Sequence, residues 1–363
     1  MGDWFIPQIE IAKNYGFKVI VTDINKKSKS FKHSDISFNV DGRDYKKIFL
    51  LLKKSNLLRD IAYIYTGTEL SKTVAYLSKK IKINWHSIKS VKICENKDYF
   101  KKHLIKNKLT FPMGISFKNL KGFKLKEKSI LKFKRIIVKP SDSSSSRGVT
   151  LLKNFKDIKK AILFAKKFSS SKTIIIEEYI DGLLLDINGV IKDKNFYPLG
   201  INDKYASSKK YQVITGLKSP TSLSLSQQTK LYKEFFKTCK TLGLGPGPVK
   251  GDYIFYKNKF YILEIATRLH GPLGSIYAIP LAYDLNPFEE LLKFILNKKL
   301  KKKIKRANNK FKIKITAKDN RIKNRNNLIV LEKKGIFNKN LWKSNYDIPI
   351  YTVEKKLMRK IKK

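Results

Sequence analysis

Apolar and polar residues alternate with two different periods along the first quarter of the chain. Apolar runs of strand length lie at 17–25 (FKVIVTDIN) and 61–67 (IAYIYTG), and apolar residues recur with helical spacing at 44–56 and 69–81. Strands and helices that follow one another at these distances are typical of a doubly wound parallel sheet. We therefore predict an α/β domain over residues 1–94.

The opening residues depart from that order. The segment MGDWFIPQIEIAKNYG has the pattern of a glycine turn followed by a helix, and no strand-like run stands before Gly2. Two explanations remain open: the sheet lacks an edge strand, or the protein starts upstream of Met1. The sequence does not decide between them.

Residues 95–300 have the pattern of an α+β arrangement. Helices are expected at 96–112, 157–168, 224–244 and 286–300. A strand–loop–strand pattern is expected within 132–152, a strand and turn at 173–182, and β-hairpins at 183–201 and 249–271. We divide this part into two lobes, 95–181 and 182–300. Beyond it, the apolar runs FKIKITA and NLIVLEK predict two strands in a small basic appendage over 301–363.

Composition narrows the class of protein without naming its function. Of the 363 residues, 79 are Lys or Arg and 29 are Asp or Glu, which gives a formal net charge of +50, and only nine of the basic residues are arginine. Nucleic-acid binding proteins rely on arginine for bidentate phosphate and guanine contacts. Because the lysines are spread over the whole chain, we favour solvated surface lysines over a polyanion-binding face and expect no nucleic-acid partner.

The sequence has the features of neither a membrane protein nor a secreted protein. No run approaches the roughly 18 consecutive apolar residues of a membrane helix, and the first residues lack the basic-then-apolar order of a signal peptide. Cys94 and Cys239 are far apart in the sequence and indicate neither a disulfide framework nor a zinc site. We expect a cytoplasmic protein with no membrane partner.

The first candidate site is the segment IIVKPSDSSSSRGVTLL. Lys139 ends an apolar strand and precedes a loop of small hydroxyl residues that closes on Arg147 and Gly148. Small residues let backbone N–H groups approach phosphate oxygens, and a nearby ammonium group neutralises those oxygens. The GxxxxGK[ST] order of a P-loop is absent, so the segment alone is also compatible with an ordinary serine turn.

The second candidate is a pair of acids on one hairpin. Asp252 follows VKG and Glu264 lies in YILEIATR, each among apolar residues. Carboxylates side by side repel each other unless a cation lies between them, and hard oxygen ligands beside a phosphate favour magnesium. Arg268, four residues after Glu264, would reach a neighbouring anion. Ion-paired surface acids are the alternative interpretation.

A third, weaker candidate is IIIEEYIDG, a strand that ends in two acids before a turn. Taken in this order behind an α/β domain, the three segments resemble the ATP-grasp superfamily, over roughly residues 2–300. The resemblance implies an N-terminal α/β domain packed on two α+β lobes that hold ATP between two sheets.

The resemblance also assigns residues. Lys97 in ENKDYF and Lys139 match the family's two nucleotide-binding lysines, Asp252 and Glu264 match its magnesium-binding acids, and Arg268 matches the arginine that faces the substrate and its acyl-phosphate. Lys139 and Arg268 are therefore the expected catalytic residues. The segment that contacts adenine corresponds to Glu177, Glu178, Tyr179 and Ile180. The loop that covers the phosphates corresponds to Ser141, Ser143, Ser144, Ser145, Ser146, Arg147 and Gly148.

Three positions depart from the family pattern. Ala266 stands where an Asn often serves as a further metal ligand, which leaves one or two metal ions open. Leu184 stands where a polar residue commonly meets the ribose, with Asp186 as a candidate substitute. The phosphate loop carries serine where glycine is commoner.

The resemblance implies an ATP-dependent ligase that uses magnesium, or manganese, to activate a small carboxylate as an acyl-phosphate for attack by an amine. One alternative is a bicarbonate-activating carboxylase or carbamoyl-phosphate-type subunit, which would need partner subunits. Another is a non-catalytic ATP- and polyanion-binding protein. A homodimer is expected at family level. His270 lies close to Arg268 in the sequence and is either an acid/base or binding group or, more simply, an ordinary loop histidine.

Overall fold

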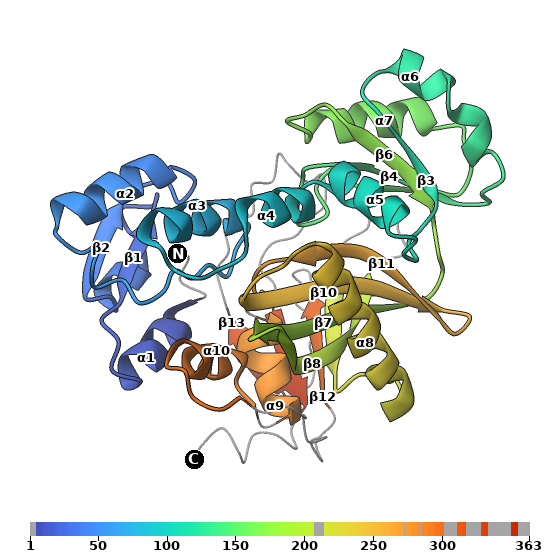
Figure 1. The fold of residues 1–363 in the computed structure, drawn as a ribbon. Helices are drawn as coiled ribbons and strands as arrows, with labels where there is room; N and C mark the ends of the chain where they lie inside the picture. Colours follow the sequence, from blue (N-terminus) through green and yellow to red (C-terminus); the bar gives the residue numbers. More distant parts are fainter. Residues whose placement is uncertain are drawn as a thin grey trace.

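The computed structural model describes residues 5–206, 214–271, 273–283 and 285–300, together with three strands of the tail. These residues form a mixed α/β structure with three parts (Figure 1). A small N-terminal unit carries a two-stranded sheet, a first lobe carries four strands, and a second lobe is built on an eight-stranded sheet.

The N-terminal unit places helices around a short parallel pair of strands. Its strands are β1 (Ile20–Asp23) and β2 (Ile36–Asn39), and its helices are α1 (Ile6–Asn14), the 3-10 turn η2 (Lys29–Lys32), α2 (Tyr45–Lys54) and α3 (Ser71–Ile81). At the start of α2, the Asp44 carboxylate accepts a hydrogen bond of 3.0 Å from the Lys47 amide, which caps the helix as its sequence position predicts. Helix α4 (Ile88–Glu95) then leads towards the first lobe (Figure 1).

The strand predicted at 61–67 is wrong. Among the described residues, β1 pairs only with β2, and a cavity of about 160 Å³ lies between β1 and the irregular segment 61–66. A strand needs a neighbour that bonds its backbone N–H and C=O groups, and no described strand pairs with this segment. Its apolar character still comes from burial, because Tyr63 and Ile64 pack against the cluster around Trp85.

The first lobe is an antiparallel sheet with helices packed against it. Its strands, in the order β3-β6-β4-β5, are β3 (Gly114–Phe117), β6 (Ile174–Glu178), β4 (Ile136–Pro140) and β5 (Thr150–Leu152). Its helices are α5 (Lys97–Lys106), α6 (Leu120–Lys124), the 3-10 turn η3 (Glu127–Ile130) and α7 (Ile158–Lys167). Buried residues of β4 and β6 pack on the apolar face of α7, where Ala161, Ile162 and Ala165 stand at helical spacing.

The second lobe is an eight-stranded sheet in the order β11-β10-β7-β8-β9-β12-β14-β13. Its first five strands are β11 (Lys259–Ala266), β10 (Gly247–Tyr256), β7 (Leu183–Lys192), β8 (Asn195–Ala206) and β9 (Ile214–Ser219). Its helices are α8 (Leu225–Thr241), the π-helix η4 (Leu273–Ala278), α9 (Ile279–Tyr283) and α10 (Pro287–Ile295). A capping box at Ser224 and Gln227 begins α8.

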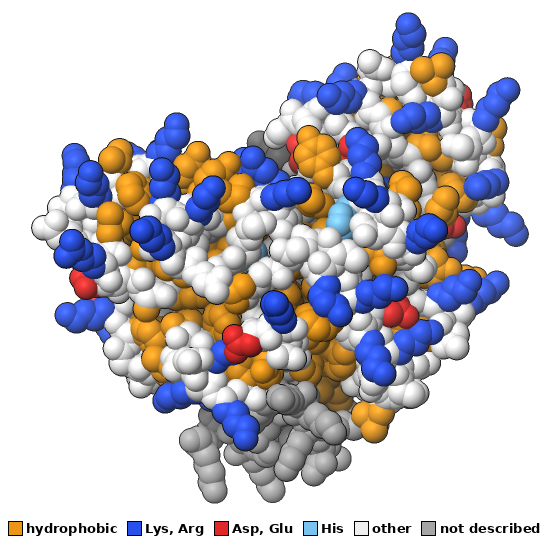
Figure 2. Space-filling view, viewed as in Figure 1, with side chains coloured by type: hydrophobic (Ala, Val, Ile, Leu, Met, Phe, Trp, Pro, Cys, Tyr) orange, Lys and Arg blue, Asp and Glu red, His pale blue; other side chains and the backbone are white. Residues whose placement is uncertain are grey.

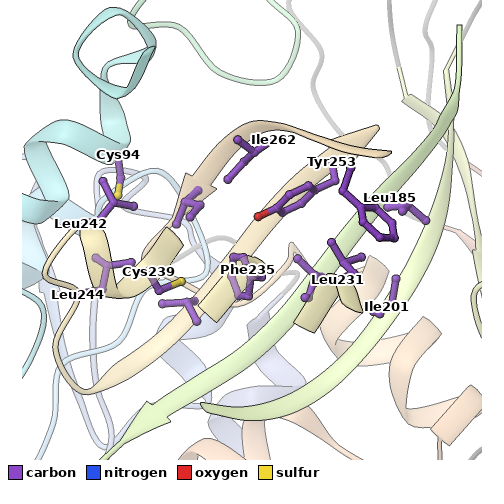
Figure 3. Close-up of a cluster of buried hydrophobic side chains, with 14 of the residues drawn as sticks. Cys94, Leu185, Ile201, Leu231, Phe235, Cys239, Leu242, Leu244, Tyr253 and Ile262 are labelled. Carbon is purple, nitrogen blue, oxygen red and sulfur yellow. The ribbon is translucent and has the colours of Figure 1, made fainter. Parts of the chain in front are cut away.

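Alternation along the central strands separates the core of this lobe from its polar face. Leu185, Ile201 and Tyr253 belong to the buried cluster that packs against Phe235 of α8 (Figure 3). A Cβ atom on Gly251 would lie 2.6 Å from Cε2 of Phe235, so the absence of a side chain lets this ring approach the strand. The residues between these apolar positions point to the opposite face.

The described part of the tail continues the same sheet. β12 (Phe311–Thr316) pairs with β9 and with β14 (Ile350–Glu354), and β13 (Leu328–Glu332) pairs with β14. The two strands predicted at FKIKITA and NLIVLEK are therefore present, and they extend the second lobe rather than forming a separate sheet. The domain boundaries at residues 94 and 300 stay predictions.

Surface charge follows no single element. On the face shown in Figure 2, lysine and arginine side chains are scattered among apolar and neutral ones over both lobes and the N-terminal unit. This face therefore shows no basic stripe of the kind that a polyanion-binding surface requires. Of the helices within the described residues, none combines the length and apolar character needed to cross a membrane.

Candidate active site between the lobes

Four polar residues stand in one row across the sheet of the second lobe. Asp252 of β10 lies opposite Glu264 of β11 on one side and opposite Asp186 of β7 on the other, and Asp186 lies opposite Asn202 of β8. Directly opposed residues project from the same face of a sheet. The structure therefore brings Asp252 and Glu264 together on one face and adds two neighbours to them.

Lysine side chains neutralise both acids. Lys250 Nζ lies 2.9 Å from Asp252 Oδ1, Lys204 Nζ lies 3.0 Å from Asp252 Oδ2, and Lys97 Nζ lies 3.2 Å from Glu264 Oε2. Burial opposes ionisation of Asp252, but the two ammonium groups outweigh it and hold the pKa of its carboxyl well below the usual range. The Lys97 ammonium lowers the pKa of Glu264 in the same way. Both side chains are therefore carboxylates at neutral pH.

The two carboxylates fit a magnesium ion that is shared with phosphate. Magnesium binds one or two protein carboxylates and takes its remaining oxygen ligands from water and substrate phosphates. Ala266 offers no ligand, and the described residues contain no cluster of three or more His, Cys, Asp or Glu side chains that could hold a metal. The donor set is thus suited to a nucleotide-bound ion rather than to one enclosed by protein alone.

Three lysines of the first lobe face this row. Lys97 and Lys101 stand four residues apart on one face of α5, and Lys139 stands on β4. Glu177 of β6 is 4% exposed. Its carboxylate forms ion pairs with the ammonium groups of Lys101, at 2.7 Å, and of Lys139. Although burial opposes it, this pairing lowers the pKa of Glu177 to about 2. Burial lowers the pKa of Lys139, and Glu177 acts against that shift.

The space between these lysines and the second lobe is small. A cavity of about 10 Å³ is bordered by Lys97, Lys101, Lys139 and Glu177 from one lobe and by Ile262 from the other. Such a volume holds about one water molecule. This cavity is therefore far smaller than a nucleotide.

The serine loop after β4 bends back towards Lys97. Lys97 Nζ donates to the Ser143 carbonyl at 2.9 Å. Ser145 and Ser146 have φ values of 54° and 57°, in the left-handed region. Consecutive residues in such turn conformations point backbone N–H groups into a shared concavity, which suits an anion. Arg147 Nη2 donates to Ser144 Oγ at 3.0 Å, so the loop is held by its own side chains.

Arg268 joins the second lobe to the N-terminal unit. Its guanidinium is 8% exposed, donates to the Leu269 carbonyl at 2.9 Å and forms an ion pair with Glu69, which is half-exposed. Burial works against the charge of Arg268, but Glu69 outweighs it and raises the pKa of Arg268. Because Nε of Arg268 is buried and has no hydrogen-bond partner among the residues that the structure describes, the guanidinium keeps unused capacity for an anion.

Comparison with known proteins identifies this architecture. Residues 94–272 match the ATP-grasp domain family. The chain belongs to the ATP-grasp superfamily. It is 28% identical over 278 residues to D-alanine–D-alanine ligase of Pelagibacter ubique, which covers 71% of this chain and 79% of that protein.

Solved structures share the ATP-grasp fold over nearly the whole chain. An L-amino acid ligase from Bacillus licheniformis has a TM-score of 0.76 at 17% identity and covers 99% of this chain and 93% of its own. The biotin carboxylase domain of the 2-oxoglutarate carboxylase of Hydrogenobacter thermophilus, solved with MgADP, ADP and bicarbonate, has a TM-score of 0.74 at 14% identity, with 97% and 84% covered. These identities support a common fold. The family match and the ligase relative identify the chain as an ATP-grasp ligase.

Two of the residues that the resemblance singled out, Ser141 and Asp186, are buried. Ser141 is fully buried, with its hydroxyl 3.0 Å from that of Ser171 and its N–H donated to Thr173. These contacts anchor the start of the serine loop. Asp186, the candidate ribose contact, is also fully buried, under His270.

Residues 177–180, the segment expected to contact adenine, make their side-chain contacts within the first lobe. Besides Glu177, the Glu178 carboxylate accepts the Met113 amide at 2.8 Å, and the Tyr179 ring lies 4.5 Å from the Arg135 guanidinium. Ile180 is 9% exposed. We therefore expect any contact with a base to come from the backbone of this segment rather than from its carboxylates.

Sequence reasoning missed four charged residues of the site. Two of them could have been predicted from the sequence. Lys101 follows Lys97 by one helical turn, and Lys250 stands two residues before Asp252 on the same face of a strand. Lys204 and Glu69 have no such signal, because only the tertiary fold brings Lys204 of β8 to Asp252 and Glu69 of the N-terminal unit to Arg268.

Proposed function

We propose that the protein is an ATP-dependent ligase that converts a small carboxylate into an acyl-phosphate, which an amine then attacks. The observation that carries this proposal is the alignment of Asp252 and Glu264 on a sheet that faces the lysines of the first lobe, with Arg268 beyond them. The ligase names of the P. ubique and B. licheniformis relatives support carboxylate–amine chemistry.

In this proposal the lysines and the serine loop hold ATP. Lys97 and Lys139 offset the charge of its phosphates, and the N–H groups near Ser145 and Ser146 cover them. Asp252 and Glu264 would hold magnesium, which when bound neutralises phosphate charge and orients the transferred group. The MgADP in the H. thermophilus structure supports this choice of nucleotide and metal.

Arg268 is proposed to bind the acid. A carboxylate oxygen attacks the γ-phosphorus of ATP, ADP leaves, and the amine then attacks the carbonyl carbon and expels phosphate. The buried guanidinium stabilises the anion in a site of low dielectric. Because Glu69 already pairs with Arg268, the incoming acid must share this arginine with Glu69 or replace it.

The substrates are proposed only as classes. Amino acids belong at the head of any acid panel, because both ligase relatives are named for them. One or two metal ions remain compatible with the two carboxylates. A homodimer, as in the carboxylase domain from H. thermophilus, is the proposed assembly.

The test is ADP formation with magnesium and hydroxylamine across a panel of amino acids, other small carboxylic acids and bicarbonate. Hydroxylamine captures an activated acyl group whatever the natural amine is. We expect ADP and a hydroxamate with one acid or a few, both lost in Glu264→Gln. Glu127→Gln, in the first lobe and outside the site, is the matched control and should keep full activity.

Other results would redirect or end the proposal. ADP with bicarbonate alone would favour the carboxylase reaction. If the protein neither binds ATP nor releases ADP with any acid, the proposed ligase activity is wrong.

A further inference from the structure

A buried polar network includes two members of the row, Asp186 and Asn202, to which the proposed function gives no role. Its centre is the Asp186 carboxylate on β7, which has no exposed surface. Asn202 Nδ2 donates to Asp186 Oδ1 at 2.7 Å, Asn188 Nδ2 lies 3.3 Å from the same oxygen, and His270 Nε2 lies 2.8 Å from Oδ2. A buried carboxylate is costly unless it is paired in this way.

Both ring nitrogens of His270 are occupied. Nε2 lies 2.8 Å from Asp186 Oδ2, and Nδ1 lies 2.9 Å from the Gly271 carbonyl oxygen and 3.0 Å from the Gly274 nitrogen. A histidine held in this way has no nitrogen left to exchange a proton with a substrate, so a role as general acid or base does not fit.

What His270 holds is the turn that follows Arg268. The His270 backbone N–H donates to Asn188 Oδ1 at 2.9 Å, and its ring contacts Asp186. Both partners lie on the same face of β7. On the other side, a Cβ on Gly274 would lie 2.3 Å from His270 Nδ1, so the ring fits only against a glycine. The turn is thus bound to the sheet at one end and to the start of η4 at the other.

We infer that Asp186, Asn188 and His270 form a positioning network that sets Arg268 in place for the acid substrate. Arg268 lies two residues before His270 and donates to the carbonyl of Leu269 within the same turn. A shift of this turn moves the guanidinium relative to the phosphate end of the site. The inference rests on the proposed function, since it takes Arg268 to be the group that binds the acid.

The two contacts of the ring can be separated by substitution. His270→Gln can place an amide N–H near the position of Nε2 and keep Asp186 paired, whereas His270→Asn can keep an acceptor for Gly274 but does not reach Asp186. Asp186→Asn keeps the shape and removes the charge. His33→Ala is the matched control, because His33 pairs with Glu10 at 2.6 Å on the exposed surface of the N-terminal unit.

The measurement is steady-state hydroxamate and ADP formation for each variant, with separate KM values for the acid and for ATP and with the midpoint of thermal unfolding. We expect KM for the acid to rise about tenfold to 100-fold in His270→Asn and Asp186→Asn. KM for ATP should stay within about twofold, and His270→Gln should recover most of the loss. His33→Ala should match wild type.

Two results would overturn the inference while leaving the proposed function intact. The first is an active wild type with an unchanged acid KM in Asp186→Asn and His270→Asn. The second is an equal rise of both KM values together with a lowered unfolding midpoint, which would make the network purely structural. An inactive wild type, by contrast, counts against the proposed function itself.

Discussion

The buried carboxylate of Glu177 gives the sharpest prediction about stability. Glu177 is 4% exposed and accepts Lys101 and Lys139, whose side chains are 12% and 11% exposed. Its pKa falls from 4.5 to about 2 on folding. At 1.36 kcal/mol for each pKa unit, this pairing stabilises the folded protein by about 3 kcal/mol at neutral pH. Glu177→Gln removes it and leaves two buried ammonium groups without a carboxylate.

The sign of the pH dependence follows from the lowered pKa. A carboxyl with a depressed pKa stabilises the fold fully above its unfolded pKa of 4.5, and this stabilisation disappears as the pH falls towards about 2. The difference between wild type and Glu177→Gln should therefore be about 3 kcal/mol at pH 7 and about half of that or less at pH 3.

Urea unfolding followed by far-UV circular dichroism at both pH values measures this difference. Asp181→Asn is the matched control, because Asp181 pairs with Arg135 at 2.7 Å but their side chains are 67% and 37% exposed. Exposed pairs contribute at most about 1 kcal/mol. The reasoning is refuted if Glu177→Gln unfolds within about 0.5 kcal/mol of wild type at pH 7, or if the difference stays constant down to pH 3.

Three further outcomes follow from the structure. Gly251→Ala places a Cβ within 2.6 Å of Phe235 and should lower the free energy of unfolding by about 1–3 kcal/mol in the same urea titration. Gly271→Ala is the control: its Cβ would have no atom of the described residues within 4 Å, and it should change the free energy of unfolding by less than about 0.5 kcal/mol. Ser224→Ala removes the capping box with Gln227 and should cost about 1 kcal/mol, measured in the same way. Chelation of divalent metal should abolish ADP formation, and added magnesium should restore it; activity that survives chelation would contradict the metal assignment.

The two hairpins show how much of the site the sequence could provide. Alternating apolar residues around a short turn predicted both of them, and because one carries Asp252 and Glu264 on its two arms, the juxtaposition of these acids followed from local pattern alone. Lys139 was singled out by its place at the end of an apolar strand before the serine loop, whereas Lys97 was identified only by resemblance to a family.

The failures have a common physical cause. Residues 61–67 look like a strand because they are apolar, but apolar character records burial, and a strand also needs a hydrogen-bonding neighbour that the described residues do not supply. Lys204 and Glu69 were missed for the same kind of reason, since each reaches its partner from an element distant in the sequence. Burial of Ser141, which directly follows β4, likewise depends on packing that the sequence does not reveal.

The lysine excess, the most conspicuous property of the sequence, does not mark the site. The charge of +50 comes from residues spread over the chain, whereas the site lysines are distinguished by burial together with a carboxylate partner. Lys250 is 5% exposed and is tolerated there because Asp252 lies 2.9 Å away. Burial lowers the pKa of a lysine, but the carboxylates near Lys250 reverse that effect and raise its pKa. Polar residues that alternate with apolar ones on a buried strand, as in Lys250-Gly251-Asp252, are therefore the sequence feature that points to this site, and net charge is not.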